Sequence, residues 1–402
     1  MADSSFSHCP GGHMSNPLVT LQQLGQSPWH DNIRRDLITS GKLAQMINDG
    51  DITGLTSNPT IFEQAIANSD AYDDDLRILA AAGKSVEASF DALAIADIKS
   101  AARLFMPVFE RTNGNDGYVS IEVAPTLAHD TQGTIEEARR LWRTVDRPNL
   151  MVKIPATLAG LPAIEVAIAE GININVTLIF SLDRYEAVVA AYLSGLQRRT
   201  QAGGNIRSIA SVASFFISRV DSAVDRLLDE KIAAAVDDTA ALRALKGRAG
   251  IANAKLAYET FRRIFGGAIF AKLAEQGARR QRPLWASTSS KNPNYADTYY
   301  VEALIGPDTV NTMPPATIVA YRDHGKPEVR IDRQVDVARE VIAGIGAAGI
   351  DFGAVLVRLE TEGVASFAKS YESLLAVVAR RTASRSNPRG AGPCAELTKS
   401  GT

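Results

Sequence analysis

The chain has 402 residues, 46% of them apolar and 22% charged, so it can bury a large core as one big α/β domain or two ordinary ones. A net charge of −2 gives no electrostatic reason to expect nucleic acid or an acidic membrane as a partner, and no apolar run reaches the ~20 residues that a membrane span needs. The start of the chain lacks the pattern of a secretory signal, and Cys9 and Cys394 indicate neither a disulfide framework nor a thiolate metal site. We therefore expect a cytoplasmic protein.

The two ends differ in composition from the rest. Residues 1–17 are predicted to be a flexible tail, in which Gly12-His13-Met14 resembles the remnant of an expression vector. Residues 381–402 are polar, contain Pro and Gly, and are predicted to be a disordered tail. Residues 18–380 show no linker or low-complexity tract and are predicted to form one domain.

Within that domain, short apolar runs alternate with helical patterns. A predicted helix at Thr134–Thr144 opens with a capping box, Leu242–Gln276 reads as one long helix, and Phe352–Arg380 adds one or two helices at the end. Further helices are predicted at Asp183–Gln197 and Asp221–Ala235. The predicted strands are Ser27–Asp31, Thr53–Ser57, Tyr118–Ala124, Leu150–Pro155, Ile172–Ile179, Ser208–Ser214, Pro283–Thr288 and Thr309–Met313. Eight strand–helix units predict an α/β fold, a single (β/α)8 TIM barrel with additional C-terminal helices.

Lys153 is an unusual residue for its position, near the end of an apolar run expected to be buried on both faces. Desolvation would lower the pKa of its ammonium, and a neutral amine is the nucleophile that forms Schiff bases with carbonyl substrates. Alternatively, the side chain extends to solvent at the strand end or pairs with a carboxylate.

The carboxyl ends of barrel strands form the active site, so polar residues there are the candidates. Glu122, Lys153 and Asn175 each interrupt an apolar run, on the third, fourth and fifth strands. One such residue could be a satisfied polar group in the core, but three on adjacent strands converge on one volume, where each needs partners. The five histidines have no spacing for a metal site.

Four segments resemble the transaldolase family, in particular its bacterial members of similar length, and the resemblance extends from about Leu18 to about Arg380. They are Gly54–Phe62, Met151–Thr157, Ile174–Ser181 and Ser211–Arg219. The resemblance implies an enzyme, a class I Schiff-base transferase of the non-oxidative pentose phosphate pathway. It would move a dihydroxyacetone unit from sedoheptulose 7-phosphate to glyceraldehyde 3-phosphate, giving erythrose 4-phosphate and fructose 6-phosphate. Sugar phosphates would be its partners, with no metal and no organic cofactor.

The resemblance also implies roles for individual residues. Lys153 would form the imine, Asp31 would accept the C4 hydroxyl proton, and Glu122 with Thr177 would relay protons through a water. Asn58, Asn175 and Ser214 would hold the dihydroxyacetone unit, and Thr56 would be a further substrate-binding residue. Arg219 would bind the phosphate with Ser287 beside it.

The chain departs from the family pattern in two places. An arginine follows the serine in the family, whereas here the basic residue is Lys291, a few positions after Ser287. His30 flanks Asp31 where close relatives have another residue, and strand alternation points it away from the site, towards a packing role. Two other functions remain open, a class I aldolase that releases free dihydroxyacetone and a non-catalytic sugar-phosphate-binding barrel. The sequence also leaves open whether the protein is a monomer or a homodimer.

Overall fold

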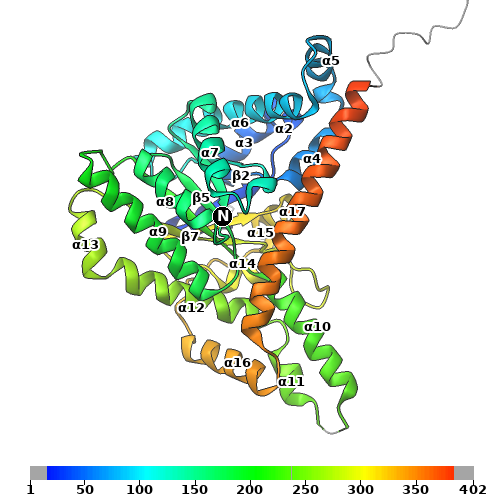
Figure 1. The fold of residues 1–402 in the computed structure, drawn as a ribbon. Helices are drawn as coiled ribbons and strands as arrows, with labels where there is room; N and C mark the ends of the chain where they lie inside the picture. Colours follow the sequence, from blue (N-terminus) through cyan, green and yellow to red (C-terminus); the bar gives the residue numbers. More distant parts are fainter. Residues whose placement is uncertain (1–15, 237, 384–402) are drawn as a thin grey trace, which may run out of the picture.

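The computed structural model describes residues 16–236 and 238–383. Its described residues contain a closed barrel of parallel strands in sequence order, in which β8 pairs with β1 (Figure 1). The predicted (β/α)8 barrel is therefore confirmed. The strands are β1 (Gln26–Asp31), β2 (Gly54–Thr56), β3 (Val119–Glu122), β4 (Leu150–Pro155), β5 (Ile174–Ile179), β6 (Ser211–Phe216), β7 (Arg282–Ala286) and β8 (Thr309–Met313).

Both faces of each strand are covered, one by the barrel interior and one by helices, and almost every strand residue is buried. Every residue of β4, β5 and β6 is buried, including Lys153 and Asn175. The register places Glu122 opposite Lys153 and Lys153 opposite Asn175. Three polar side chains on adjacent strands therefore lie at one level of the barrel, as the sequence predicted.

Helices surround the barrel, and the connections after β2 and β6 each contain several of them (Figure 1). The helices before β6 are α1 (Pro17–Gln23), α2 (Arg35–Thr39), α3 (Lys42–Asn48), α4 (Pro59–Ala67), α5 (Asp73–Ala81), α6 (Val86–Arg111), α7 (Thr131–Val145), α8 (Gly160–Glu170) and α9 (Leu182–Gln201). Those after β6 are α10 (Ser218–Ala234), α11 (Ala240–Leu245), α12 (Ala249–Phe265), α13 (Ala268–Ala274), α14 (Tyr299–Ala303), α15 (Pro315–His324), α16 (Val335–Ala347) and α17 (Phe352–Ala383).

Two details of the helix predictions are wrong. The helix predicted at Thr134 begins earlier, because the side chain of Asp130 accepts a hydrogen bond from the Gly133 N–H and caps α7. Thr134 then lies inside α7 and its hydroxyl donates to the Leu127 carbonyl. The single helix predicted at 242–276 is divided into α11, α12 and α13, and Gly247 has a left-handed φ of 70° at the first break.

Helix α17 is one long helix that runs along the side of the barrel, from α10 at one end to α4 and α5 at the other (Figure 1). It approaches β5 closely at Gly363, where a Cβ atom would lie 3.0 Å from the Leu178 side chain. Leu178 has a φ of 61° at an irregularity in the β5–β6 pairing. Such irregularities bend a strand and redirect side chains, and this one lies beside Thr177, a predicted site residue.

The predicted domain boundaries need small corrections. Pro17 begins α1 rather than ending a tail, and α17 continues past residue 380 to Ala383. The remaining residues of both predicted tails lie outside the described part of the chain.

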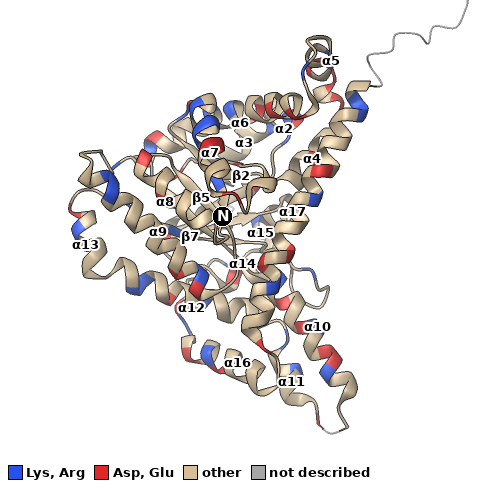
Figure 2. Cartoon of the chain, in the orientation of Figure 1, with Lys and Arg blue, Asp and Glu red and all other residues tan. Residues whose placement is uncertain are grey.

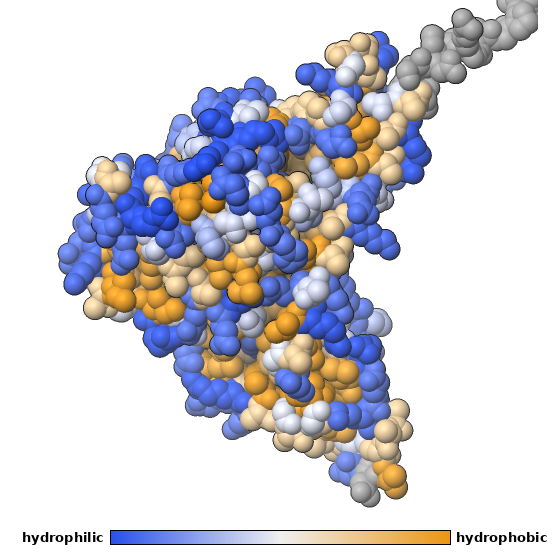
Figure 3. Space-filling view, viewed as in Figure 1, coloured by the Kyte–Doolittle hydropathy of each residue, from blue (hydrophilic) through white to orange (hydrophobic). Residues whose placement is uncertain are grey.

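The surface carries both signs of charge. Lys and Arg residues alternate with Asp and Glu residues over the helices (Figure 2), and hydrophilic residues cover most of the face in Figure 3, with apolar residues in separate patches. Across the described residues, no single helix has the length and apolar character to cross a membrane, and only a bent pair, Val335–Ala347 with Phe352–Ala383, meets that test by length and composition.

Candidate active site

Lys153 lies at the centre of the polar level of the barrel. Its side chain is only 6% exposed and that of Glu122 only 4%, and the Lys153 Nζ lies 3.1 Å from Glu122 Oε2. The Nζ also donates to the backbone carbonyl of Ser57, at 3.2 Å. Lys153 therefore does not extend to solvent. It is paired with a carboxylate inside the barrel, within reach of the cavity at the strand ends.

Glu122 and Thr177 each present a buried oxygen atom without a hydrogen-bond partner in the described part of the chain: Glu122 Oε1 and Thr177 Oγ1. Burial raises the pKa of the Glu122 carboxyl, and the positive charge of Lys153 opposes that effect. A buried polar atom without a partner costs about 1–3 kcal/mol, so it calls for a water or a ligand. The two side chains predicted to relay protons thus have free acceptor positions beside Lys153.

Asp31 ends β1 and lines the cavity that contains Lys153. Its Oδ1 accepts a hydrogen bond of 2.8 Å from the Thr56 hydroxyl, and Thr56 in turn lies 2.6 Å from the hydroxyl of Thr312. Burial raises the pKa of Asp31, while the charge of Lys153 and the Thr56 hydrogen bond act in the opposite direction. A carboxyl with a raised pKa is better able to accept and return a proton near neutral pH.

Asn175 and Ser214 form a hydrogen-bonded pair. The Ser214 hydroxyl donates to Asn175 Oδ1 at 2.8 Å, and Asn175 Nδ2 donates to the hydroxyl of Ser120 at 3.1 Å. Ser214 lines the cavity, whereas Asn175 is fully buried and does not. The amide of Asn58 lines the cavity, and its Oδ1 accepts the Ile61 N–H and caps α4.

The predicted phosphate residues gather at the cavity mouth. Arg219, on the first turn of α10, lies 5.2 Å from the ring centroid of Phe216, and burial lowers the pKa of its guanidinium. Within the described residues it has no carboxylate within ion-pair distance. Ser287 has a left-handed φ of 58° and lies 2.9 Å, hydroxyl to hydroxyl, from Ser218. Lys291 lines the same cavity and donates to Ser289.

Several lining residues were not predicted from the sequence. Phe216 shares a face of β6 with Ser214, so strand alternation could have indicated it. Phe367 comes from α17, with its ring centroid 5.4 Å from Lys153 Nζ and 6.0 Å from the Arg219 guanidinium carbon. No local pattern in α17 marks Phe367. The other unpredicted lining residues are Thr60, Ile61, Ala286, Ser289, Thr312 and Pro314.

His30 is buried and does not line this cavity, as strand alternation predicted. Burial lowers the pKa of its imidazole to about 4, so the ring is neutral at ordinary pH. In the part of the chain that the structure describes, no group of three or more His, Cys, Asp or Glu residues is placed to hold a metal ion.

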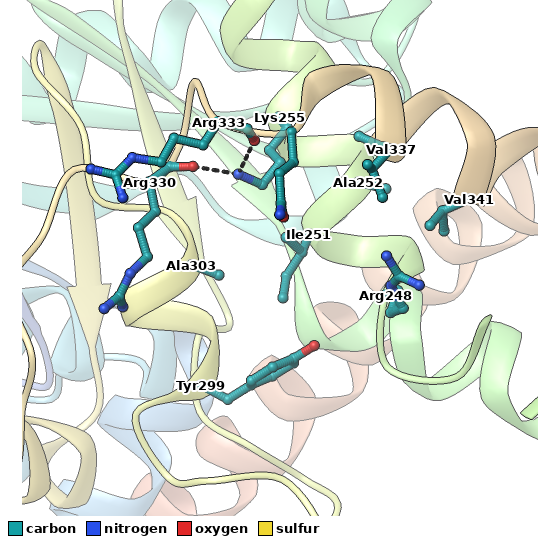
Figure 4. A pocket seen from close by; sticks show the side chains of 12 residues that line it. Arg248, Ile251, Ala252, Lys255, Tyr299, Ala303, Arg330, Arg333, Val337 and Val341 are labelled. Carbon is teal, nitrogen blue, oxygen red and sulfur yellow. Dashed lines mark hydrogen bonds between the residues drawn. The ribbon is translucent and has the colours of Figure 1, made fainter. Parts of the chain in front are cut away.

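A separate pocket lies outside the barrel between α12 and α16 and contains none of the predicted site residues (Figure 4). Its basic side chains are used structurally. The Lys255 ammonium donates to the backbone carbonyls of Arg330 and Arg333, and both arginines form ion pairs with Glu328. The predicted catalytic residues are therefore found at the Lys153 cavity and not at this pocket.

Sequence comparison identifies the family of the chain. The profile described as "Transaldolase/Fructose-6-phosphate aldolase" matches residues 28–378. The chain belongs to the transaldolase/fructose-6-phosphate aldolase family. It is 48% identical over 365 residues to "Transaldolase 2" of Nostoc sp., covering 90% of this chain and 96% of that protein. It is 49% identical over 358 residues to a transaldolase of Thiobacillus denitrificans, covering 89% and 98%. It is 50% identical over 371 residues to a transaldolase of Thermobifida fusca, covering 92% and 99%. All the predicted site residues, from Asp31 to Lys291, lie inside the matched region.

Proposed function

We propose that the chain is a transaldolase whose nucleophile is Lys153. It transfers a dihydroxyacetone unit from sedoheptulose 7-phosphate to glyceraldehyde 3-phosphate, giving erythrose 4-phosphate and fructose 6-phosphate in the non-oxidative pentose phosphate pathway. The observation that carries the proposal is the buried Lys153–Glu122 pair at 3.1 Å, at the strand ends of a barrel 48–50% identical to proteins named transaldolase.

In the first half-reaction, the Lys153 amine attacks the C2 carbonyl of the ketose phosphate. Glu122, aided by a water held between its free Oε1 and the Thr177 hydroxyl, protonates the departing C2 oxygen, and the carbinolamine loses water to give the iminium ion. Asp31 then accepts the C4 hydroxyl proton as the C3–C4 bond breaks. The electron pair of that bond moves into the enamine, and the aldose phosphate leaves.

In the second half-reaction, the enamine attacks the aldehyde of the acceptor, and Asp31 returns its proton to the new alkoxide. Water then hydrolyses the iminium ion. Asn58 and Ser214 line the cavity where the three-carbon unit would remain between the two steps. Arg219 offers the phosphate a guanidinium, and Lys291 and Ser287 add an ammonium and a hydroxyl at the mouth. The ring of Phe367 covers Lys153 and Arg219, and would limit the access of water to the imine.

Every step uses groups of the chain itself, so the proposal includes no metal and no organic cofactor. Sugar phosphates are the expected partners. The cytoplasmic location, the absence of nucleic acid and membrane partners, and a monomeric or homodimeric state stay predictions from the sequence.

Borohydride trapping with fructose 6-phosphate, followed by mass mapping, tests the nucleophile. We expect a reduced adduct on the peptide that contains Lys153 and none in Lys153→Met. An adduct on another lysine, or none at all, would refute the assignment. Turnover of fructose 6-phosphate with and without erythrose 4-phosphate separates a transferase from an aldolase, because fast release of dihydroxyacetone without an acceptor would favour the aldolase.

A further inference from the structure

A second cavity lies beside the substrate cavity, on the other side of Glu122. It is bounded by the end of β3 and by residues of α4, α6, α7 and α17. Asn58 lines both cavities, whereas Glu122 lines only the second and Lys153 only the first. The Lys153–Glu122 pair therefore forms part of the wall between them.

Glu122, which lines this cavity, has a carboxylate oxygen that accepts no hydrogen bond from the described residues. Glu122 Oε2 faces Lys153, while Oε1 has no hydrogen-bond partner among the described residues, although the side chain is only 4% exposed. A buried carboxylate oxygen calls for a donor, and a donor with a positive charge gives the stronger hydrogen bond. The cavity thus ends at a position suited to an N–H group of a cation.

The wall of the cavity is aromatic. Phe62 packs against Phe90 edge to face, with ring centroids 5.6 Å apart, and Phe90 packs in the same way against Tyr371, at 5.9 Å. All three side chains line the cavity, as do Ala94, Ile121 and Glu122. Aromatic rings favour an apolar or aromatic body, and their faces attract a cation.

The mouth of the cavity carries excess negative charge. Arg140 lies 2.7 Å from both Asp91 and Glu137 and balances one of these carboxylates. Glu87, which also lines the cavity, has no ion-pair or hydrogen-bond partner in residues 16–236 and 238–383, and Glu122 is balanced by Lys153. Two negative charges remain after the pairs are counted, which attracts cations and repels sugar phosphates.

We propose that this second cavity binds a small organic cation, a protonated amine on an aromatic or apolar body. Its N–H donates to Glu122 Oε1, its ring packs along Phe90 and Tyr371, and Glu87 attracts it at the mouth. The bound amine engages the same oxygen, Oε1, that Glu122 uses in the proposed relay, so its kinetic effect rests on the proposed function. Because the substrate enters through the other cavity, the amine lowers kcat and leaves KM for fructose 6-phosphate nearly unchanged.

N,N-dimethyl-2-phenylethylammonium is a suitable probe, since it retains one N–H and, as a tertiary amine, forms no imine with aldehyde substrates. Its N,N,N-trimethyl analogue has the same charge and ring but no N–H. We expect saturable binding of the first by calorimetry with non-competitive inhibition, and at least about tenfold weaker binding of the second, since a charge-assisted hydrogen bond is lost. Equal affinity of the two probes, or inhibition competitive with fructose 6-phosphate, would overturn the proposal.

Two variants outside the catalytic residues test the location. Ala94→Leu fills the cavity and should abolish binding, with kcat in the absence of amine within about twofold of the original. Glu87→Gln should weaken binding about threefold through the lost charge, whereas Glu110→Gln, on the same helix α6 but outside the cavity, should not. Unchanged binding in both Ala94→Leu and Glu87→Gln refutes the site. Borohydride trapping at Lys153 without amine reports on the catalytic proposal independently.

Discussion

Asp31→Asn separates the proposed base from the proposed nucleophile. Asparagine has nearly the shape of aspartate, and its Oδ1 can still accept the 2.8 Å hydrogen bond from Thr56, so the cavity keeps its geometry. The variant cannot accept the C4 hydroxyl proton. General base catalysis contributes about 100- to 10,000-fold, so we expect kcat to fall by that factor, equivalent to about 3–5 kcal/mol in the barrier to bond cleavage. Imine formation needs Lys153 and Glu122 instead, so borohydride should still trap the fructose 6-phosphate adduct.

The same substitution should affect stability in the opposite direction. Burial raises the pKa of Asp31 above its value in the unfolded chain. Such a group contributes stability below its unfolded pKa of about 4, and that contribution is lost as pH rises through the folded pKa. Near neutral pH the charged Asp31 therefore costs stability that a neutral amide does not, and Asp31→Asn should have the higher Tm at pH 7.5, with the difference shrinking towards pH 4. Turnover close to the original rate, or a lower Tm at pH 7.5, would show that the reasoning is wrong.

Three further substitutions test other parts of the site. Arg219→Gln should raise KM for phosphorylated substrates roughly tenfold to a hundredfold, because charge-assisted hydrogen bonds to the phosphate are lost. It should have little effect on the KM for unphosphorylated glyceraldehyde as acceptor. The matched control is Arg226→Gln, at an exposed residue of the same helix that is paired with Glu230. Thr177→Val should leave Tm nearly unchanged, because Thr177 Oγ1 has no hydrogen bond to lose within the described chain. The same variant should slow imine formation about tenfold or more in rapid-quench trapping. A normal rate of imine formation would show that Thr177 is not part of the relay. Phe367→Leu should increase release of dihydroxyacetone without acceptor, relative to transfer, and an unchanged ratio would mean that Phe367 does not limit water.

The barrel was predictable because its strands have a simple signal. Strands covered on both faces tend to be rich in apolar residues, as β4 is apart from Lys153, and the observed bounds of β4 and β8 equal the predicted ones. Helix ends were harder to predict, since several residues nearby can serve as caps. Asp and Thr are both good N-cap residues, and in the structure Asp130 caps α7 while Thr134 lies inside it. The breaks at Gly247 and at 266–267 interrupt an otherwise continuous helical pattern.

The site was predictable to the extent that it follows strand ends. Asp31, Glu122 and Lys153 stand out because each places a charge in or next to an apolar run, and parallel strands bring such positions together. Phe367 lies more than 200 residues from Lys153 along the chain, and an aromatic residue in an amphipathic helix is ordinarily a core residue. Only the course of α17 along β5 brings it to the cavity. Asn175, in contrast, was predicted as a site residue and lies at the expected level of the barrel, but its amide is hydrogen-bonded to Ser120 and Ser214.

The pairing of Lys153 with Glu122 by itself fits both a structural and a catalytic role. Stability does not explain the pair well, because the desolvation of two buried charges offsets most of their attraction and apolar residues of similar size often serve as well. The second oxygen of Glu122 distinguishes the two roles. In a purely structural pair, the surrounding chain would be expected to satisfy both carboxylate oxygens, as Asp97 shows, where Arg35 binds one oxygen and Tyr72 the other. Glu122 keeps Oε1 without a partner in the described chain, and Thr177 Oγ1 is left in the same way. A carboxylate that holds a lysine with one oxygen and keeps the other open is arranged to exchange protons, which favours the catalytic role.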